Sequence, residues 1–357
     1  MSAIIEATSA YEAWMRRRIA VVEADLRAKH RAMAKVPFAF LRATFYRWVP
    51  LWREACPELA EAPHLLAIGD LHAENFGTWR DAEGRLCWGV NDFDEAFPMP
   101  YAIDLVRLAT SLMLAIRTEG LKLAAGEACH GLLEGYAAGL DQGRGLVLEE
   151  EHPALRAMAM GADRDPDRFW AKLTKGKPAT PPHGLGKLLR KALPEGAEKP
   201  RILHRIAGLG SLGRPRYVAI GIAGGGLLAR EAKAVLPSAY AFALGADEKK
   251  SFTGALAKRA IRSPDPFYRL HKRWLLRRLA PHCSKIEFTE LPRRRDDLRL
   301  VKAMGRETAN VHLGTPEAAA AIRRDLQRRK SGWLFDAASR MTTATLADWQ
   351  DWRRRHG

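Results

Sequence analysis

The chain has 357 residues, enough for two lobes and a sizeable core. With 47% hydrophobic and 28% charged residues, its composition is typical of a soluble globular protein. The net charge of +17 favours an anionic partner, although a generally basic surface explains it equally well. The four cysteines are far apart without a CxxC, which argues against a zinc cluster or a disulfide scaffold and fits a reducing cytoplasm. No secretory signal is visible, and the longest apolar run, 217–229, is too short and glycine-rich to span a membrane.

The N-terminal half is predicted to contain two domains. Residues 1–60 have a helical pattern, which Pro37 and Pro50 are expected to interrupt. Residues 61–200 begin with short strands and continue as helix over 101–141, where apolar side chains recur at helical spacing. The predicted strands of this domain are 65–68, 76–79 and 86–90. Its end, 174–200, is rich in Pro, Gly and Lys and is predicted to be a linker or mobile loop.

The C-terminal half is predicted to form a small β domain, 201–291, followed by helices in 292–357 that return to the helical lobe. The predicted strands of this half are 216–222, 227–233, 274–279 and 285–290, and the first helix after them is 298–312. Together the elements predict an α+β fold with one small antiparallel β lobe and one larger helical lobe.

Two acidic clusters carry the strongest chemical signal. Asp70 lies in a loop after a predicted strand, where a carboxylate can accept the proton of an attacking hydroxyl. Asn75 follows five residues later, and Asp92 and Asp94 follow the next predicted hairpin. These amide and carboxylate oxygens are suitable ligands for Mg²⁺, and alternate residues of an extended segment share a side. The alternative is that the four residues only cap loops and turns.

Asp104 and Arg107 open the predicted helix that follows. A carboxylate there is stabilised by free backbone N–H groups, so Asp104 either caps the helix or braces the loop at Asp70. Arg107 lies one turn further on, where it could pair with Asp104.

A glycine-rich loop appears in the predicted β domain. Gly208, Gly210 and Gly213 form a G-x-G-x-x-G that includes Ser211 and is followed by a strand, a turn and a strand ending at Lys233. Glycines let a backbone approach phosphates, and a lysine neutralises their charge. The alternative is an ordinary hairpin with a surface lysine. Glu231 is expected on the same side of the strand as Lys233, which weakly supports a pair between them.

The order of these features is unusual for a kinase-like chain, because the glycine loop and the lysine follow the Asp70 loop. In aminoglycoside-phosphotransferase-like folds, a helix with an Ala-x-x-His ending leads directly into the catalytic loop. The predicted helix ending at His312 has that pattern. A chain that starts near the catalytic loop and ends with this helix would be circularly permuted, and its site would remain intact if the new termini lie at the surface.

These motifs closely resemble those of the bacterial domain-of-unknown-function family 2252 over nearly the whole chain. That family is grouped with protein-kinase-like phosphotransferases, so the resemblance implies their fold and nucleotide binding, without an agreed substrate. The matching stretches are Pro37–Arg42, Gly69–Gly77, Asn91–Ala96, Asp104–Leu108, Gly210–Gly213, Glu231–Lys233 and the helix ending at His312.

By this likeness Asp70 matches the catalytic aspartate, Asn75 and Asp92 the metal ligands, and Lys233 the phosphate-binding lysine. His72, within the matching Gly69–Gly77 stretch, is assigned a supporting role. Three departures stand out: Ile68 replaces a usual histidine, Ala43 replaces a glycine, and the glutamate partner of Lys233 is identified only by position, as Glu248.

The leading interpretation is an ATP- and Mg²⁺-dependent phosphotransferase, with ATP or another purine nucleotide as donor and a small-molecule hydroxyl as acceptor. Alternatives are nucleotidyl transfer on the same fold, and a non-catalytic nucleotide-binding pseudokinase or basic interaction module. We expect a cytoplasmic protein without a membrane partner. Nucleic acid is not an expected partner, because aromatic residues are not interleaved with the basic runs.

Overall fold

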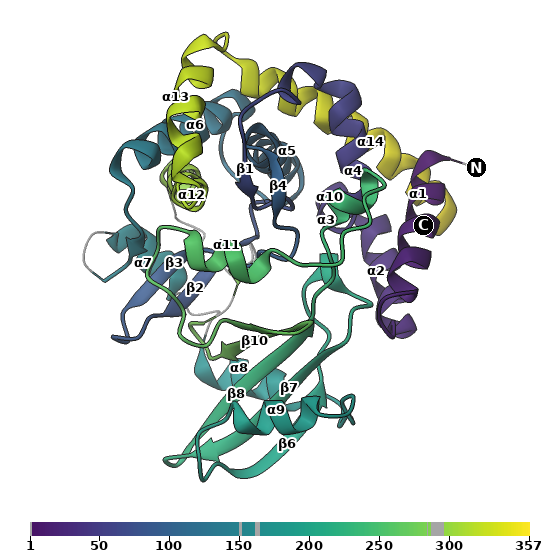
Figure 1. Ribbon diagram of the computed structural model, residues 1–357, viewed down its shortest axis with the longest axis vertical. Helices are drawn as coiled ribbons and strands as arrows, with labels where there is room; N and C mark the ends of the chain where they lie inside the picture. The colour runs from purple at the N-terminus through teal and green to yellow at the C-terminus, as the bar shows by residue number, and fades with distance from the viewer. Residues whose placement is uncertain (1, 150–151, 161–164, 284, 287–295) are drawn as a thin grey trace.

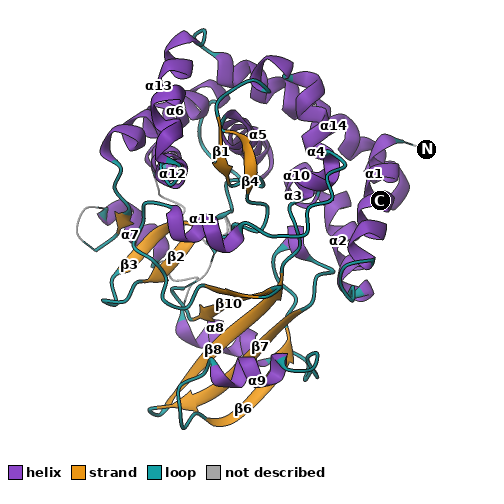
Figure 2. Ribbon diagram, viewed as in Figure 1, coloured by secondary structure: helices purple, strands orange, loops and turns teal. Residues whose placement is uncertain are grey.

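The computed structural model describes residues 2–149, 152–160, 165–283, 285–286 and 296–357. Within these residues the fold is α+β, as the sequence predicts: helices form the larger body, and a five-stranded antiparallel sheet extends from one end of it (Figures 1 and 2). None of the described helices is both long enough and apolar enough to cross a bilayer.

The helices are α1 Ala3–Arg16, α2 Glu23–Lys35, α3 Pro37–Ala43, α4 Phe45–Ala55, α5 Ala102–Thr118, α6 Ala125–Gln142, α7 Pro153–Ala159, α8 Pro166–Thr174, α9 Leu185–Lys191, α10 Ala239–Ala243, α11 Thr253–Arg259, α12 Asp297–His312, α13 Ala319–Arg328 and α14 Trp333–His356. The strands are β1 His64–Ala67, β2 Phe76–Arg80, β3 Leu86–Val90, β4 Phe97–Pro100, β5 Leu146–Val147, β6 Glu198–His204, β7 Arg216–Ala223, β8 Gly226–Ala234, β9 Arg269–His271 and β10 Trp274–Leu279.

The N-terminal segment is helical, as predicted, but its two prolines act differently. Pro37 begins α3, where its missing N–H is not needed. Pro50 lies inside α4 and does not break it, contrary to the prediction. Because proline has no N–H, α4 loses one backbone hydrogen bond at this position. The neighbouring Trp48, Val49 and Trp52 are almost completely buried. Their packing outweighs the local cost.

The three strands predicted in 61–200 all form, but not as one sheet. β2 and β3 pair with each other over Phe76 to Val90, and β5 extends that sheet. β1 instead pairs with β4 in a separate two-stranded ribbon. The loop that carries Asp70 therefore runs from one small sheet to the other.

The five-stranded sheet has the order β6-β7-β8-β10-β9. The predicted strands at 216–222, 227–233 and 274–279 are confirmed, and the β7–β8 turn uses Gly224 and Gly225 at φ values of 57° and 78°. Of the predicted strand at 285–290, residues 287–290 lie outside the described residues, while Lys285 forms an isolated bridge with Gly77.

Helices cover both faces of this sheet. Leu173 of α8 packs with Leu203 and Val218, whereas Leu185 of α9 packs with the alternate strand residues Ile202 and Ala219. Since α9 lies within 174–200, the prediction of a linker or loop there is wrong. The apolar residues of α9 recur at helical spacing, and the sheet gives them a surface to cover. Two short helices missed by the β pattern, α10 and α11, follow β8.

Helix α12 confirms the predicted helix at 298–312 and packs directly on α6. A Cβ on Gly135 of α6 would lie 2.0 Å from the carbonyl oxygen of Lys302, and one on Gly305 of α12 would lie 2.2 Å from that of Leu132. The backbones of α6 and α12 are therefore in direct contact, and glycine is required at both positions. This contact fixes the position of α12 and of His312 at its end.

Candidate active site

Asp70 is held by Arg107. The guanidinium donates to Asp70 Oδ1 from Nε at 2.9 Å and from Nη2 at 2.5 Å. Arg107 is fully buried against the rings of Phe45 and Trp48, and it also donates to the Leu41 carbonyl at 2.7 Å. Arg107 therefore binds Asp70 rather than the neighbouring Asp104 that helical spacing suggested. Both of these bonds use Oδ1, so Oδ2 is the oxygen turned toward the glycine loop.

Asp104 braces the start of the Asp70 loop. Its two carboxylate oxygens accept from the backbone N–H groups of Ile68 and Gly69, each at 2.7 Å, and from His312 Nε2 at 2.9 Å. His312 Nδ1 lies 2.8 Å from the Tyr136 hydroxyl. Asp104 therefore holds the Asp70 loop and does not cap the N-terminus of its own helix, which is one of the two interpretations that the sequence left open.

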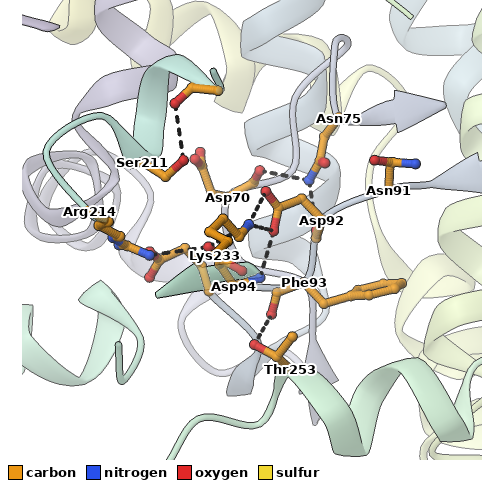
Figure 3. Close-up of polar contacts among 12 residues, drawn as sticks. Asp70, Asn75, Asn91, Asp92, Phe93, Asp94, Ser211, Arg214, Lys233 and Thr253 are labelled. Atoms are coloured by element: carbon orange, nitrogen blue, oxygen red, sulfur yellow. Dashed lines mark hydrogen bonds and ion pairs between the residues drawn. The ribbon is translucent and has the colours of Figure 1, made fainter. Parts of the chain in front are cut away.

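Asn75, Asp92 and Asp94 lie around Asp70 (Figure 3). Asn75 Nδ2 donates to the Asp70 carbonyl at 3.3 Å and the Asp92 carbonyl at 3.0 Å. Its Oδ1 is buried without a hydrogen-bond partner, and so is Asp94 Oδ1. These two buried oxygens are the atoms that remain available to a further ligand.

Lys233 joins the two aspartates. Its Nζ lies 2.8 and 3.0 Å from the Asp92 oxygens and 2.8 Å from Asp94 Oδ2, while Arg214 donates to the same Asp94 oxygen at 3.2 Å (Figure 3). Burial disfavours an ionised Asp92, but Lys233 and Lys285 outweigh it and hold the pKa of Asp92 well below its usual range. Burial and the Asp92 charge raise the pKa of Asp94.

The expected glutamate partners of Lys233 are not its partners. Glu231 does share its side of the strand, but it is bound by three arginines: Arg205, Arg216 at 3.0 Å and Arg277 at 2.7 Å. Glu248 instead accepts from the backbone N–H groups of the two lysines that follow it. Lys233 is paired with Asp92 and Asp94 across the site.

The glycine loop lies against Asp70. Between β6 and β7 it forms a short 3-10 turn, Leu209–Ser211, with positive φ at Gly208 (73°) and Gly213 (93°). A Cβ on Gly210 would be 2.7 Å from the Arg42 carbonyl oxygen and 3.6 Å from Asp70 Oδ2, so only glycine fits. Ser211 Oγ donates to the Gly208 carbonyl at 3.1 Å and accepts from Arg216 at 2.7 Å. It stabilises the loop from within.

One cavity connects these groups. Its accessible volume is about 50 Å³, a few times the ~10–15 Å³ that one water needs. An ion together with phosphate oxygens is of this size, whereas a whole nucleoside triphosphate is larger. Its walls include Asp70, Asn75, Asp92, Asp94 and the glycine loop, and also four basic residues that were not among the predicted site residues: Lys29, Arg42, Arg214 and Lys285.

His72 lies at the edge of the cavity, edge-on to the Phe38 ring. Burial, together with the nearby Lys285 and Arg42, lowers its pKa well below the usual range, so the imidazole is neutral at pH 7. Arg42 forms an ion pair with Glu74. Arg42 belongs to a recognised motif, but Lys29 and Arg214 come from helix and loop positions with no local signal of a site.

The donor set fits a hard cation only in part. In the described ranges no three His, Cys, Asp or Glu side chains are grouped to hold a metal ion. The predicted metal ligands Asp92, Asp94 and Asn75 do line the cavity, and one oxygen each of Asp94 and Asn75 is buried and unpartnered. Mg²⁺ is commonly held by one or two carboxylates together with substrate phosphates, so this set suits a metal that arrives with a phosphate ligand.

Residues 18–171 match the model of a family described as "Uncharacterized protein conserved in bacteria (DUF2252)". The match includes Asp70, Asn75, Asp92 and Asp94, whereas the glycine loop and Lys233 lie beyond it. No curated protein and no solved structure matches the chain. The family description names no activity, so an argument about function depends on the chemistry of the site.

Proposed function

We propose that this protein is an ATP- and Mg²⁺-dependent phosphotransferase that acts on the hydroxyl of a small molecule. The observation that carries the proposal is the contact between Lys233 and Asp92, which are 141 positions apart, beside a cavity shared by Asp70 and the glycine loop. In kinases the glycine-rich loop joins the first two strands of the small lobe, the lysine lies on the third strand, and an acidic metal ligand lies opposite the lysine. In this chain β6, β7 and β8 supply that order.

The kinase-like, circularly permuted fold is part of the same proposal. The Asp70 loop precedes the glycine loop in the chain, yet the two are neighbours at the cavity. The end of α12 also reaches the Asp70 loop, because His312 binds Asp104 and Asp104 holds Ile68 and Gly69. A permuted kinase-like chain needs both of these contacts.

In the proposed reaction, the acceptor oxygen attacks the γ-phosphorus while the bond to the bridging oxygen breaks. ADP leaves with that electron pair, and Asp70 accepts the hydroxyl proton. Arg107 occupies Oδ1 of Asp70 and so orients Oδ2 toward the cavity. Asn75, Asp92 and Asp94 would hold Mg²⁺, which neutralises charge on the phosphate oxygens when it is bound.

The first test is a thermal shift with ATP, with and without Mg²⁺. At an ATP concentration ~100-fold above the dissociation constant measured with Mg²⁺, the expected gain in stability is about 2.7 kcal/mol. At the same ATP concentration without Mg²⁺, the gain should be smaller. Mass analysis of the products then distinguishes a phosphorylated acceptor plus ADP from a nucleotidylated acceptor plus pyrophosphate. No shift with any purine nucleotide at millimolar concentration would remove the ATP proposal.

The second test separates binding from chemistry. Asp70→Asn removes the proton acceptor at nearly constant size, so turnover should fall by roughly 10²–10⁴-fold while nucleotide affinity changes little. Lys233→Ala should weaken nucleotide binding instead. Asp141→Asn is the matched control, since that carboxylate is 75% exposed on α6. If Asp70→Asn does not fold, Asp70 is a structural residue and the assignment fails.

A further inference from the structure

Lys29 differs from the other buried cations of the site. It projects from α2, its residue is 5% exposed, and its Nζ donates to the Gly210 carbonyl at 3.3 Å. Within the described part of the chain no carboxylate lies within ion-pair distance of it. Three other buried cations of the site have acidic partners: Arg107 has Asp70, Arg214 has Asp94 and Glu95, and Lys233 has Asp92 and Asp94. The two half-buried cations of the cavity also lie near a carboxylate, since Arg42 is paired with Glu74 and Lys285 interacts with the charge of Asp92.

A buried ammonium group without an ion-pair partner is costly, and native proteins pair such groups or bind ligands with them. Burial and the nearby Arg214 lower the pKa of Lys29 to about 8, against the weaker opposing charges of Glu12, Asp70 and Glu95, and this still leaves it mostly protonated at pH 7. Lys29 lines the cavity, so its charge can reach a ligand bound there.

The position of Lys29 places that ligand on the Asp70 side of the cavity. Gly210 lies between them: its carbonyl accepts from Lys29, and its Cα faces Asp70 Oδ2. The opposite side already has its own cations, since Lys233 and Lys285 lie beside Asp92. Donor phosphates therefore have partners that do not include Lys29.

We propose that the acceptor carries a small oxyanion, a phosphate or a carboxylate, and that Lys29 binds this group while the acceptor hydroxyl lies at Asp70. The Tyr46 ring, 5.7 Å from Lys29 Nζ, and the Tyr11 ring stacked on it supply an adjoining wall for the carbon skeleton. The role of the hydroxyl rests on the proposed function, but the oxyanion site does not.

A structural role for Lys29 makes the opposite prediction. If Lys29 serves only to tie α2 to the glycine loop, Lys29→Met should melt at a lower temperature than the wild type. If Lys29 is kept for a ligand, removing a buried unpaired charge should leave the unliganded protein as stable as the wild type, or more stable.

The experiment measures melting of the full chain in inorganic phosphate against sodium chloride of equal ionic strength. Phosphate should raise the melting temperature of the wild type and of Lys35→Met, a control at an exposed position of the same helix, but not that of Lys29→Met. Lys29→Gln serves if the methionine variant does not fold.

Each outcome decides the proposal. A phosphate shift that survives in Lys29→Met, or one that also disappears in Lys35→Met, overturns it, as does a lower melting temperature of Lys29→Met in chloride. The shift with ATP and Mg²⁺ should persist in Lys29→Met. If ATP has no effect on any variant but the phosphate shift still depends on Lys29, the phosphotransferase proposal fails and the oxyanion site stands.

Discussion

Asp104 allows the support of the Asp70 loop to be tested without touching the reacting groups. Its side chain is completely buried and accepts three hydrogen bonds, from Ile68 N, Gly69 N and His312 Nε2. Asp104→Ala leaves these donors buried without partners. Each unsatisfied donor costs about 1–3 kcal/mol, so the two backbone groups alone predict a loss of roughly 2–6 kcal/mol.

Asp104→Asn should lie between the wild type and the alanine variant. The amide keeps one acceptor oxygen but turns an NH₂ group toward the other backbone N–H, so about half of the alanine effect is expected. Urea unfolding at pH 7 measures the free energy, and hydrogen exchange at the Ile68 and Gly69 amides locates the change. Asp141→Ala, on an exposed side chain, should stay within about 0.5 kcal/mol of the wild type.

The brace assigned to Asp104 is contradicted if Asp104→Ala loses less than about 1 kcal/mol, or if the two amides exchange as in the wild type. Either result would mean that the 68–69 backbone is held by something other than this carboxylate. A large loss of stability with unchanged exchange at these amides would place the role of Asp104 at His312 instead.

Two further changes probe the cavity wall. Native Lys29 loses its proton near pH 8 while the unfolded lysine keeps it to about pH 10.5, so the unfolded state binds more protons in that window. Wild-type stability should therefore rise from pH 8 to 10.5 relative to Lys29→Met, by up to about 3 kcal/mol, in urea melts across that range; a flat difference contradicts the assignment. Gly210→Ala places a Cβ 2.7 Å from the Arg42 carbonyl, so the loop must move. We expect a stability loss of ~1–3 kcal/mol and a weaker phosphate shift, and unchanged values would contradict the close approach.

Local sequence signals predicted the elements whose stability depends mainly on their own residues. The glycine turn between β7 and β8 and the amphipathic α12 appear where the sequence places them. The errors occur where packing overrides a local signal. The proline and glycine content of 174–200 predicted a loop there, but the apolar face of α9 packs on the sheet and stabilises the helix. Pro50 is a helix-breaking signal in the sequence, but the buried tryptophans around it keep α4 continuous.

The same distinction applies to the candidate site. Asp70, Asn75, Asp92 and Asp94, which line one cavity, could be selected as candidates from the sequence because they lie within short motifs. Their partners could not be, because pairing depends on which segments the fold brings together. Arg107 is close to Asp104 in sequence yet binds Asp70, and Glu231 gathers three arginines instead of Lys233. Lys29 comes from a helix whose sequence resembles an ordinary charged surface.

The contacts of Lys233 bear on how a metal would enter the site. Its ammonium group already holds both oxygens of Asp92 and one of Asp94, which are the charged ligands proposed for the metal. A metal alone must compete with a buried cation for them. A nucleotide changes this balance, because its phosphates offer Lys233 a new partner and bring further oxygens to the metal. Metal and nucleotide should therefore bind as a unit, which is why the effect of Mg²⁺ in the presence of ATP says more about this site than its effect alone.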